Sequence, residues 1–334
     1  MKFYSLLFCL VLKFSLIYAT SAQAFDKGIY ITQSTLANTQ YLTQLINQSK
    51  EVGINTFVVD LKKDTRSYSK NIKLIKSNGI RYVARIVVFA KGGNINQVRS
   101  LNYWKKKYHL VDAAIKYGAD EIQLDYIRYS TKQRPSSQNS VDIHNVIKWF
   151  KSQNNVPLQI DVFGEASFKP STRIGQDVRL FAPSVDAVCP MVYPSHYKPY
   201  SYHSNRPYET INKSLKAMRL QFNNKPPFKI KPYIEATNFR YKMSTDTKIA
   251  YILEQIRAVE DNDSDGWYVW SANNKYGALF KALKLKNNGQ TVQADFNFAP
   301  KSKSKSRPKK QKQHYKTNID MEKWKAFKQR QRAR

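Results

Sequence analysis

The chain has 334 residues and a formal net charge of +32, which comes from 56 Lys or Arg against 24 Asp or Glu. An excess this large favours anionic partners such as acidic polysaccharide, lipopolysaccharide or phospholipid headgroups, although a Lys-rich solvated surface would also produce it. The two cysteines are Cys9, which lies in an expected leader, and Cys189, so the mature chain has no intramolecular disulfide and depends on its core for stability.

The first 24 residues have the pattern of a secretory signal peptide. Lys2 gives a positive start, residues 6–18 are largely apolar, and Ala22-Gln23-Ala24 is a small-x-small cleavage site. We expect cleavage after Ala24 and residence in the periplasm or outside the cell. An uncleaved membrane anchor is the alternative, but the apolar run is shorter than the roughly 20 residues that a spanning helix needs.

Three junctions between polar, helix-period segments and apolar runs each contain a glycine: Gly53, Gly79 and Gly118. Glycine takes the left-handed conformation at a helix end without steric cost. A strand that follows each helix indicates βαβ units and therefore a parallel sheet.

Eight apolar runs are candidate strands, and the intervals allow one helix each. The expected strands are 28–32, 56–61, 82–89, 121–125, 158–163, 187–193, 230–236 and 266–271. The expected helices are 40–52, 71–77, 102–117, 141–151, 176–181, 208–221, 247–261 and 276–285. Eight such repeats predict an α/β fold, a (β/α)8 TIM barrel over residues 25–286. A doubly wound sheet would usually carry a Gly-rich phosphate loop after its first strand, where this chain has Thr32-Gln33-Ser34-Thr35.

Residues 287–334 differ in character from the rest of the chain. From 301 onward they carry 14 Lys or Arg and 2 Asp or Glu, in low-complexity sequence that cannot bury apolar surface, so we expect a basic, largely disordered tail. Residues 321–334 would place Trp324 and Phe327 on one side of a short basic helix, which suits an anionic surface. A merely solvated tail is the alternative.

Carboxylates stand at two neighbouring predicted strand ends. Asp125 ends the fourth strand and Asp161 lies near the end of the fifth. Enzymes with this fold keep their chemistry at the C-terminal ends of the strands, and glycoside cleavage generally needs two carboxyl groups that flank the scissile bond. Asp125 and Asp161 are therefore candidate catalytic residues, and helix capping or structural hydrogen bonding is the alternative role for each.

Two arginines and a further aspartate are candidate substrate-binding residues. Arg85 and Arg128 could hold a catalytic carboxylate in its ionised form or clamp an acidic sugar. A structural ion pair of Arg85 with Asp60 or Asp125 is equally compatible with the sequence. Asp60 shares a strand face with Lys62, so it would either form a structural pair with that lysine or contact substrate.

Aromatic and imidazole side chains follow the sixth and eighth strands. Tyr193 and His196 could orient a sugar or carry a proton, although packing alone would explain them. Trp267 and Trp270 could provide a stacking surface for a sugar ring, although large aromatic residues are also ordinary core. We count all four among the candidate substrate-binding residues.

Four segments resemble a known family: residues 121–129 (EIQLDYIRY), 161–164 (DVFG), 190–197 (PMVYPSHY) and 266–270 (GWYVW). They resemble the glycosyl hydrolase domain family of exported bacterial proteins, which belongs to the TIM-barrel glycoside hydrolases. Residues 59–64 and 84–89 are similar to that family's second and third strands, and the likeness covers about residues 27–284. The resemblance implies a barrel that hydrolyses O-glycosyl bonds.

The chain departs from this family in its seventh strand. Glu235 stands where the resemblance implies an amide, so we place it with the substrate-binding candidates and not with the catalytic ones. There is also a looser similarity to chitinase-type barrels, in Asp125, in the Met191-Val192-Tyr193 stretch and in Trp270. The full chitinase motif is absent, because Gln123 and Asp125 stand where that motif has Asp and Glu.

Several other classes of function have no support in the sequence. The five histidines show no HxH or HExxH spacing, and there is no GxGxxG, P-loop or GxSxG motif, so neither a metal nor a cofactor is expected and nucleic acid is not an expected partner. Cys189 lies within an apolar strand, which predicts a buried, inert thiol.

We therefore predict an exported glycoside hydrolase that acts on a polysaccharide. The positive charge of the chain favours an anionic polysaccharide. A glycan-binding barrel without catalysis and a scaffold tethered to anionic surfaces by its tail are the alternatives.

Overall fold

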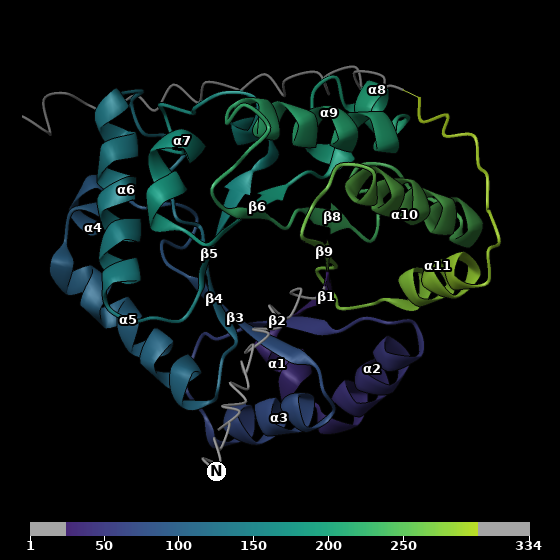
Figure 1. Ribbon diagram of the computed structural model, residues 1–334, viewed down its shortest axis with the longest axis horizontal. Coiled ribbons are helices and arrows are strands. Elements are labelled where there is room, and N and C mark those ends of the chain that lie inside the picture. Colours follow the sequence, from purple (N-terminus) through teal and green to yellow (C-terminus); the bar gives the residue numbers. More distant parts are fainter. Residues whose placement is uncertain (1–24, 300–334) are drawn as a thin grey trace, which may run out of the picture. The chain divides into compact units, whose positions relative to one another are not determined.

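The computed structural model describes residues 25–299, which form a (β/α)8 barrel with the strands around a common centre and the helices outside them (Figure 1). The predicted fold class is thereby confirmed. The expected signal peptide (1–24) and the tail from residue 300 lie outside the described residues. Within residues 25–299, no helix has both the length and the apolar character needed to cross a membrane.

The strands are parallel and close into a ring, because β5 pairs with β6 and β1 pairs with β9. β7 and β8 are two pieces of the seventh barrel strand, separated at Lys231 and Pro232. A proline has no N–H to donate to a neighbouring strand. The strands are β1 (Asp26–Ile31), β2 (Thr56–Asp60), β3 (Arg81–Val87), β4 (Glu121–Asp125), β5 (Leu158–Phe163), β6 (Ala187–Met191), β7 (Lys229–Ile230), β8 (Tyr233–Glu235) and β9 (Gly266–Trp270).

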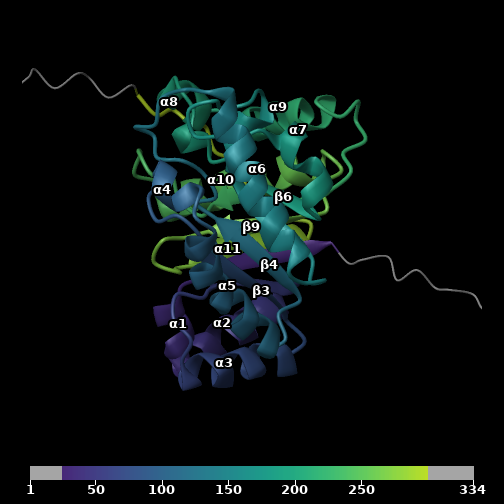
Figure 2. The same cartoon turned by 90° about the vertical axis from the view of Figure 1, so that its left-hand side faces the viewer.

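The helices cover the outside of the barrel, and both views show α5 and α6 over β3 and β4 (Figures 1 and 2). They are α1 (Gln33–Ala37), α2 (Thr39–Glu51), α3 (Arg66–Ser77), α4 (Ile95–Val98), α5 (Leu101–Lys116), α6 (Ser137–Ser152), α7 (Val178–Phe181), α8 (Tyr200–Ser204), α9 (Pro207–Leu220), α10 (Thr245–Glu260) and α11 (Gly277–Asn287). The sequence did not predict α1, α4 and α8, which have only four or five residues each and therefore show little apolar periodicity.

The predicted strands and the main helices are confirmed to within a few residues. Gly53, Gly79 and Gly118 have φ values of 78°, 74° and 76°, so each helix before them ends as the sequence predicted. Each strand then buries one face against the helices. Ile29, Ile122 and Trp267 belong to this outer core.

The interior of the barrel is filled in layers, as is usual for this fold. At the N-terminal end of the strands, Asp26, Arg81, Glu121 and Lys231 form a ring of ion pairs with N–O distances of 2.6–2.7 Å. Lys231 is 1% exposed and contacts both carboxylates. This layer closes the bottom of the barrel with two cations and two anions.

The middle layer consists of hydrogen-bonded amides and aromatic rings. The side-chain amide of Gln123 donates to Gln159 at 2.9 Å and accepts from the Tyr233 hydroxyl at 2.8 Å. Cys189 is fully buried beside them, as predicted, and burial raises the pKa of its thiol well above the usual value. Above Gln123 and Gln159, at the C-terminal ends of the strands, the barrel opens into a cavity.

The chain remains packed beyond α11, past Lys286, where the sequence placed the end of the domain. Phe298 stacks on Tyr241 with ring centroids 5.0 Å apart, and its backbone N–H and C=O both bond to the Asn205 side chain. Phe296 packs edge-on against Tyr251 of α10. Residues 288–298 therefore lie along the barrel between α11 and α8 (Figure 1).

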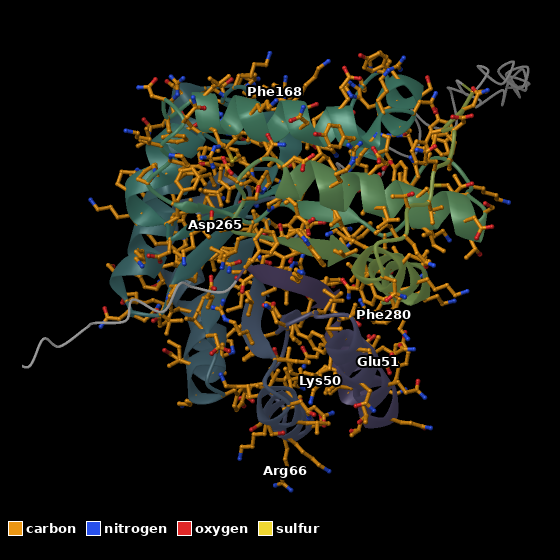
Figure 3. The ribbon with its side chains drawn as sticks, turned by 45° about the vertical axis from the view of Figure 1, so that its right-hand side comes forward. Lys50, Glu51, Arg66, Phe168, Asp265 and Phe280 are labelled. Carbon is orange, nitrogen blue, oxygen red and sulfur yellow. The ribbon has the colours of Figure 1, made fainter. Side chains whose placement is uncertain are left out.

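The ion-pair layer gives a first prediction about stability. We expect Lys231→Met to lower the free energy of unfolding by about 3–5 kcal/mol, because it leaves Asp26 and Glu121 buried with too little compensating charge. Lys284→Met is the matched control, since Lys284 pairs with Glu51 on the exposed outer surface (Figure 3). It should change stability by less than about 1 kcal/mol. Urea unfolding measures both, and equal losses in the two variants would contradict the role given to Lys231.

Candidate active site

A cavity of about 770 Å³ opens at the C-terminal ends of the strands. Its wall combines strand-end residues with the loops that follow β4, β5 and β6. Seven of the residues predicted from the sequence line it: Arg85, Asp125, Arg128, Asp161, Tyr193, His196 and Trp270. A large concave site with converging polar groups is where a ligand is expected to bind.

Arg85 occupies the centre of the cavity floor and contacts three aspartates. Its Nη1 donates to Asp60, its Nη2 donates to Asp125, and its Nε lies 3.7 Å from Oδ2 of Asp161. Burial alone would lower the pKa of Arg85, but the charges of Asp125, Asp60 and Asp161 raise it well above the usual value. The guanidinium is therefore a permanent cation that gathers carboxylates from β2, β4 and β5.

Asp60 has a structural place in this cluster. It is 2% exposed, accepts a hydrogen bond of 2.7 Å from the Tyr30 hydroxyl and does not line the cavity. Lys62 lies 3.4 Å from Asp60 but is 65% exposed, so the stronger anchor is Arg85. The structure thus places Asp60 behind the cavity wall, which favours the structural role over the substrate contact that the sequence also left open.

Asp125 is fixed at both oxygens. Oδ2 accepts from Arg85 and Oδ1 accepts from the backbone N–H of Tyr126. Tyr126 has a φ of +52°, a left-handed conformation that is uncommon for an aromatic residue. Backbone strain of this kind clusters at functional sites, and here it turns the chain so that the residue after the carboxylate can bond to it.

Asp161 has a different environment from Asp125. It is 2% exposed, and its Oδ1 has no hydrogen-bond partner among residues 25–299. Burial and the neighbouring charge of Asp125 raise the pKa of Asp161 well above the usual value, and Arg85 offsets this only in part. A carboxyl group whose surroundings raise its pKa is suited to hold a proton and to act as an acid.

The loop after β6 forms one aromatic side of the cavity. The Tyr193 ring lies 5.6 Å from that of Trp270, and His196 packs edge-on against Tyr193 at 5.2 Å. Burial and the charge of Arg240 lower the pKa of His196, so its imidazole is neutral at pH 7. Trp270 is partly exposed to the cavity, where its ring is available to a ligand.

Glu235 supports this loop from behind. Its carboxylate accepts from the backbone N–H of Ser195 at 3.0 Å, from the Ser195 hydroxyl at 2.6 Å and from the Tyr251 hydroxyl at 2.9 Å. It is fully buried and does not line the cavity, so the structure places it behind the cavity wall. Because Ser195 precedes His196, Glu235 acts on the site by fixing the position of the loop.

Trp267 also lies outside the cavity. Side chains alternate along β9, so Tyr268 and Trp270 face the interior while Trp267 points outward into the core beneath the helices. Its indole is fully buried there. The structure therefore brings only Trp270 of this pair to the cavity.

Sequence reasoning missed several cavity residues, of which Glu165 carries the most chemistry. It follows β5 in a short 3-10 helix (Gly164–Ser167) and is exposed at the cavity. A Cβ at Gly164 would collide with the Tyr197 hydroxyl, so this glycine lets the two loops approach. Its position in the sequence could have identified Glu165, because it directly follows the DVFG segment. Phe168, three residues further, is half exposed at the same end of the barrel (Figure 3).

Comparison with known proteins agrees with this arrangement. Residues 95–276, more than half of the chain, match the family described as "Putative glycosyl hydrolase domain". The chain belongs to this family. The resemblance inferred from the sequence is thereby confirmed, and the match includes β4, β5, β6, β8 and β9, which carry most of the cavity residues. No curated protein matches the chain.

Solved structures share the fold at low sequence identity. The spore cortex-lytic enzyme SleL of Bacillus cereus aligns over 84% of this chain and 76% of its own, with 11% identity and a TM-score of 0.55. The C-terminal domain of a "putative chitinase" from Desulfitobacterium hafniense aligns over 78% of this chain and 98% of its own, with 10% identity and a TM-score of 0.53. At these identities the likeness establishes the barrel, while the chemistry has to be argued from the site.

The described residues offer no set of ligands for a metal. Between residues 25 and 299, no three His, Cys, Asp or Glu side chains are grouped so that they could hold an ion. The three aspartates of the floor are instead neutralised in part by Arg85.

Glu235 gives a prediction about pH. Burial raises its pKa to about 7 from a usual value near 4.5, so the folded protein binds a proton more tightly than the unfolded chain. The stabilisation from this proton is complete below about pH 4.5 and is lost as the pH rises through 7. The free energy of unfolding falls by about 3 kcal/mol over this range. Glu235→Gln should remove this dependence and make the variant more stable than the parent at pH 8.

Urea unfolding of the parent and of Glu235→Gln between pH 5 and 8 measures the difference. Glu51→Gln serves as the control, because the Glu51 carboxylate is exposed on the outer surface. That variant should follow the parent at every pH. A Glu235→Gln profile parallel to the parent profile would show that the carboxyl group does not carry the predicted proton.

Proposed function

We propose that this protein is an exported glycoside hydrolase that cleaves a polysaccharide in the cavity at the C-terminal ends of its strands. The observation that carries the proposal is the pair of carboxyl groups on Arg85, of which Asp161 has a buried, unpartnered oxygen and a raised pKa. Membership of a glycosyl hydrolase family supports the reaction class. Export is proposed from the signal-peptide pattern of residues 1–24.

In this mechanism Asp161 is the general acid. Its unpartnered Oδ1 holds the proton and donates it to the glycosidic oxygen as the bond to the anomeric carbon breaks. Asp125 acts on the sugar as the second carboxyl group, either by attack on the anomeric carbon or by activation of a water molecule. Arg85 is a positioning residue, because it contacts both carboxyl groups and balances part of their charge.

Binding of the sugar is assigned to the aromatic side of the cavity. Trp270 and Tyr193 have their rings at an interplanar angle of 31°, and Tyr126 lies on the loop after β4, also in the cavity wall. Sugar rings stack on such faces through their apolar C–H surfaces. His196 is neutral and exposed at the cavity, so it is suited to hydrogen bonding with a sugar hydroxyl.

The first test is reducing-sugar release from neutral and acidic polysaccharides by the mature protein. We expect Asp125→Asn and Asp161→Asn to lower the rate by about 10²- to 10⁴-fold, the usual size of a contribution from a positioned acid or base. Asp112→Asn, an exposed position on α5, is the matched control and should leave the rate unchanged.

A second substrate separates the two roles. On an aryl glycoside of the same sugar the leaving group needs little protonation, so Asp161→Asn should recover much of its activity while Asp125→Asn should not. Equal defects of both variants on both substrates would contradict this division of roles. No release from any substrate, with glycan binding retained, would identify a binding protein without catalysis.

A further inference from the structure

We infer that the bound glycan carries an anionic substituent and that Arg128 holds it on the wall of the cavity. The inference rests on the proposed function, since it names the substrate class of the same site. From the sequence, Arg85 and Arg128 were both candidates to hold a catalytic carboxylate or to clamp an acidic sugar. The structure gives them different tasks.

Arg85 is already occupied by the protein. Its guanidinium contacts Asp60, Asp125 and Asp161, which leaves little of its charge for a ligand. Arg128 is 7% exposed and lines the cavity, yet no carboxylate of residues 25–299 lies within ion-pair distance of it. Its side chain makes one hydrogen bond to the described residues, from Nη1 to the Tyr129 carbonyl at 2.9 Å.

The Arg128 side chain is held in place without a ligand. Its guanidinium carbon lies 5.1 Å from the centre of the Tyr126 ring and 4.9 Å from that of Phe163. Gly92 makes room for it, because a Cβ there would lie 2.5 Å from Nη1. A donor group that is already immobilised loses little conformational entropy when it binds.

The electrostatics of Arg128 favour an anion. A buried cation without a countercharge carries an uncompensated desolvation cost, and burial accordingly lowers the pKa of Arg128 despite the neighbouring Asp125. An anion in the cavity would relieve this cost. The planar guanidinium matches the two oxygens of a carboxylate or a sulfate. Lys198 and Arg240 also line the cavity, so its wall carries positive charge besides that of Arg128 as well as carboxyl groups.

The test uses three sugars with one ring: sodium glucuronate, glucose 6-sulfate and glucose. Each is titrated into the mature protein labelled with ¹⁵N-arginine, and the Nε–H signal of Arg128 is followed by NMR. We expect saturable shifts of this signal with a charged sugar and none with glucose. Arg128→Lys keeps the positive charge but loses the paired N–H donors of the guanidinium, so it should weaken binding of the charged sugar about tenfold or more.

Arg66→Lys is the matched control, because Arg66 is exposed on the outer surface at the start of α3 (Figure 3). It should bind the charged sugars as the parent does. A response to glucuronate alone would identify a uronic acid, and a response to glucose 6-sulfate alone would identify a sulfate ester. If Arg128→Lys does not fold, the titration of the parent protein still tests the inference. The Arg128 signal of the parent is then assigned through its backbone resonances.

Three outcomes would overturn the inference: no shift with either charged sugar, an equal shift with glucose, or unchanged affinity in Arg128→Lys. The readout is binding and needs no turnover. Anion binding at Arg128 without hydrolysis would therefore refute the proposed reaction alone. Hydrolysis of neutral glycans by a protein whose Arg128 does not respond would refute the anionic substrate alone.

Discussion

The ion pairs of Arg85 determine the rest of the site. One guanidinium in the upper barrel gathers carboxylates from three strands, and each of those strands would otherwise end in a buried negative charge. Because the contacts use all three nitrogens of the side chain, they set the orientation of Asp125 and Asp161 relative to each other. Without this cation, three carboxyl groups so close together in a buried place would repel one another more strongly.

The buried charged side chains inside the barrel form two separate layers. At the bottom, Asp26, Arg81, Glu121 and Lys231 are matched two against two, and the layer lies away from the cavity. At the top, three aspartates face one arginine, so the layer has an excess of negative charge beside the cavity. An excess of buried carboxyl groups over cations lowers the stability of the fold and makes a carboxyl group available for proton transfer. Burial, together with the neighbouring charge of Asp125, raises the pKa of Asp161 in this layer.

Support for the site extends outward from the cavity. Glu235 lies behind the loop that carries His196, and its three hydrogen bonds fix that loop against α10. The family resemblance implies an amide at this position, which could accept the same backbone hydrogen bond without a buried charge. Glu235 is thus a place where the chain differs from its family in electrostatics while the loop geometry can be kept.

The sequence by itself determined the barrel and the approximate place of the site. Alternation along each strand and a glycine at each helix end are properties of neighbouring residues, so the eight strands and the ends of three helices could be predicted. Asp125 and Asp161 were brought to one cavity for the same reason, since parallel strands end at one edge. Only the tertiary structure decided which of Trp267 and Trp270 faces the cavity, that Glu235 lies behind a loop, and that Arg85 is paired while Arg128 is not. These outcomes depend on contacts between residues far apart in the chain, and the strand register and loop packing that create such contacts leave no local pattern in the sequence.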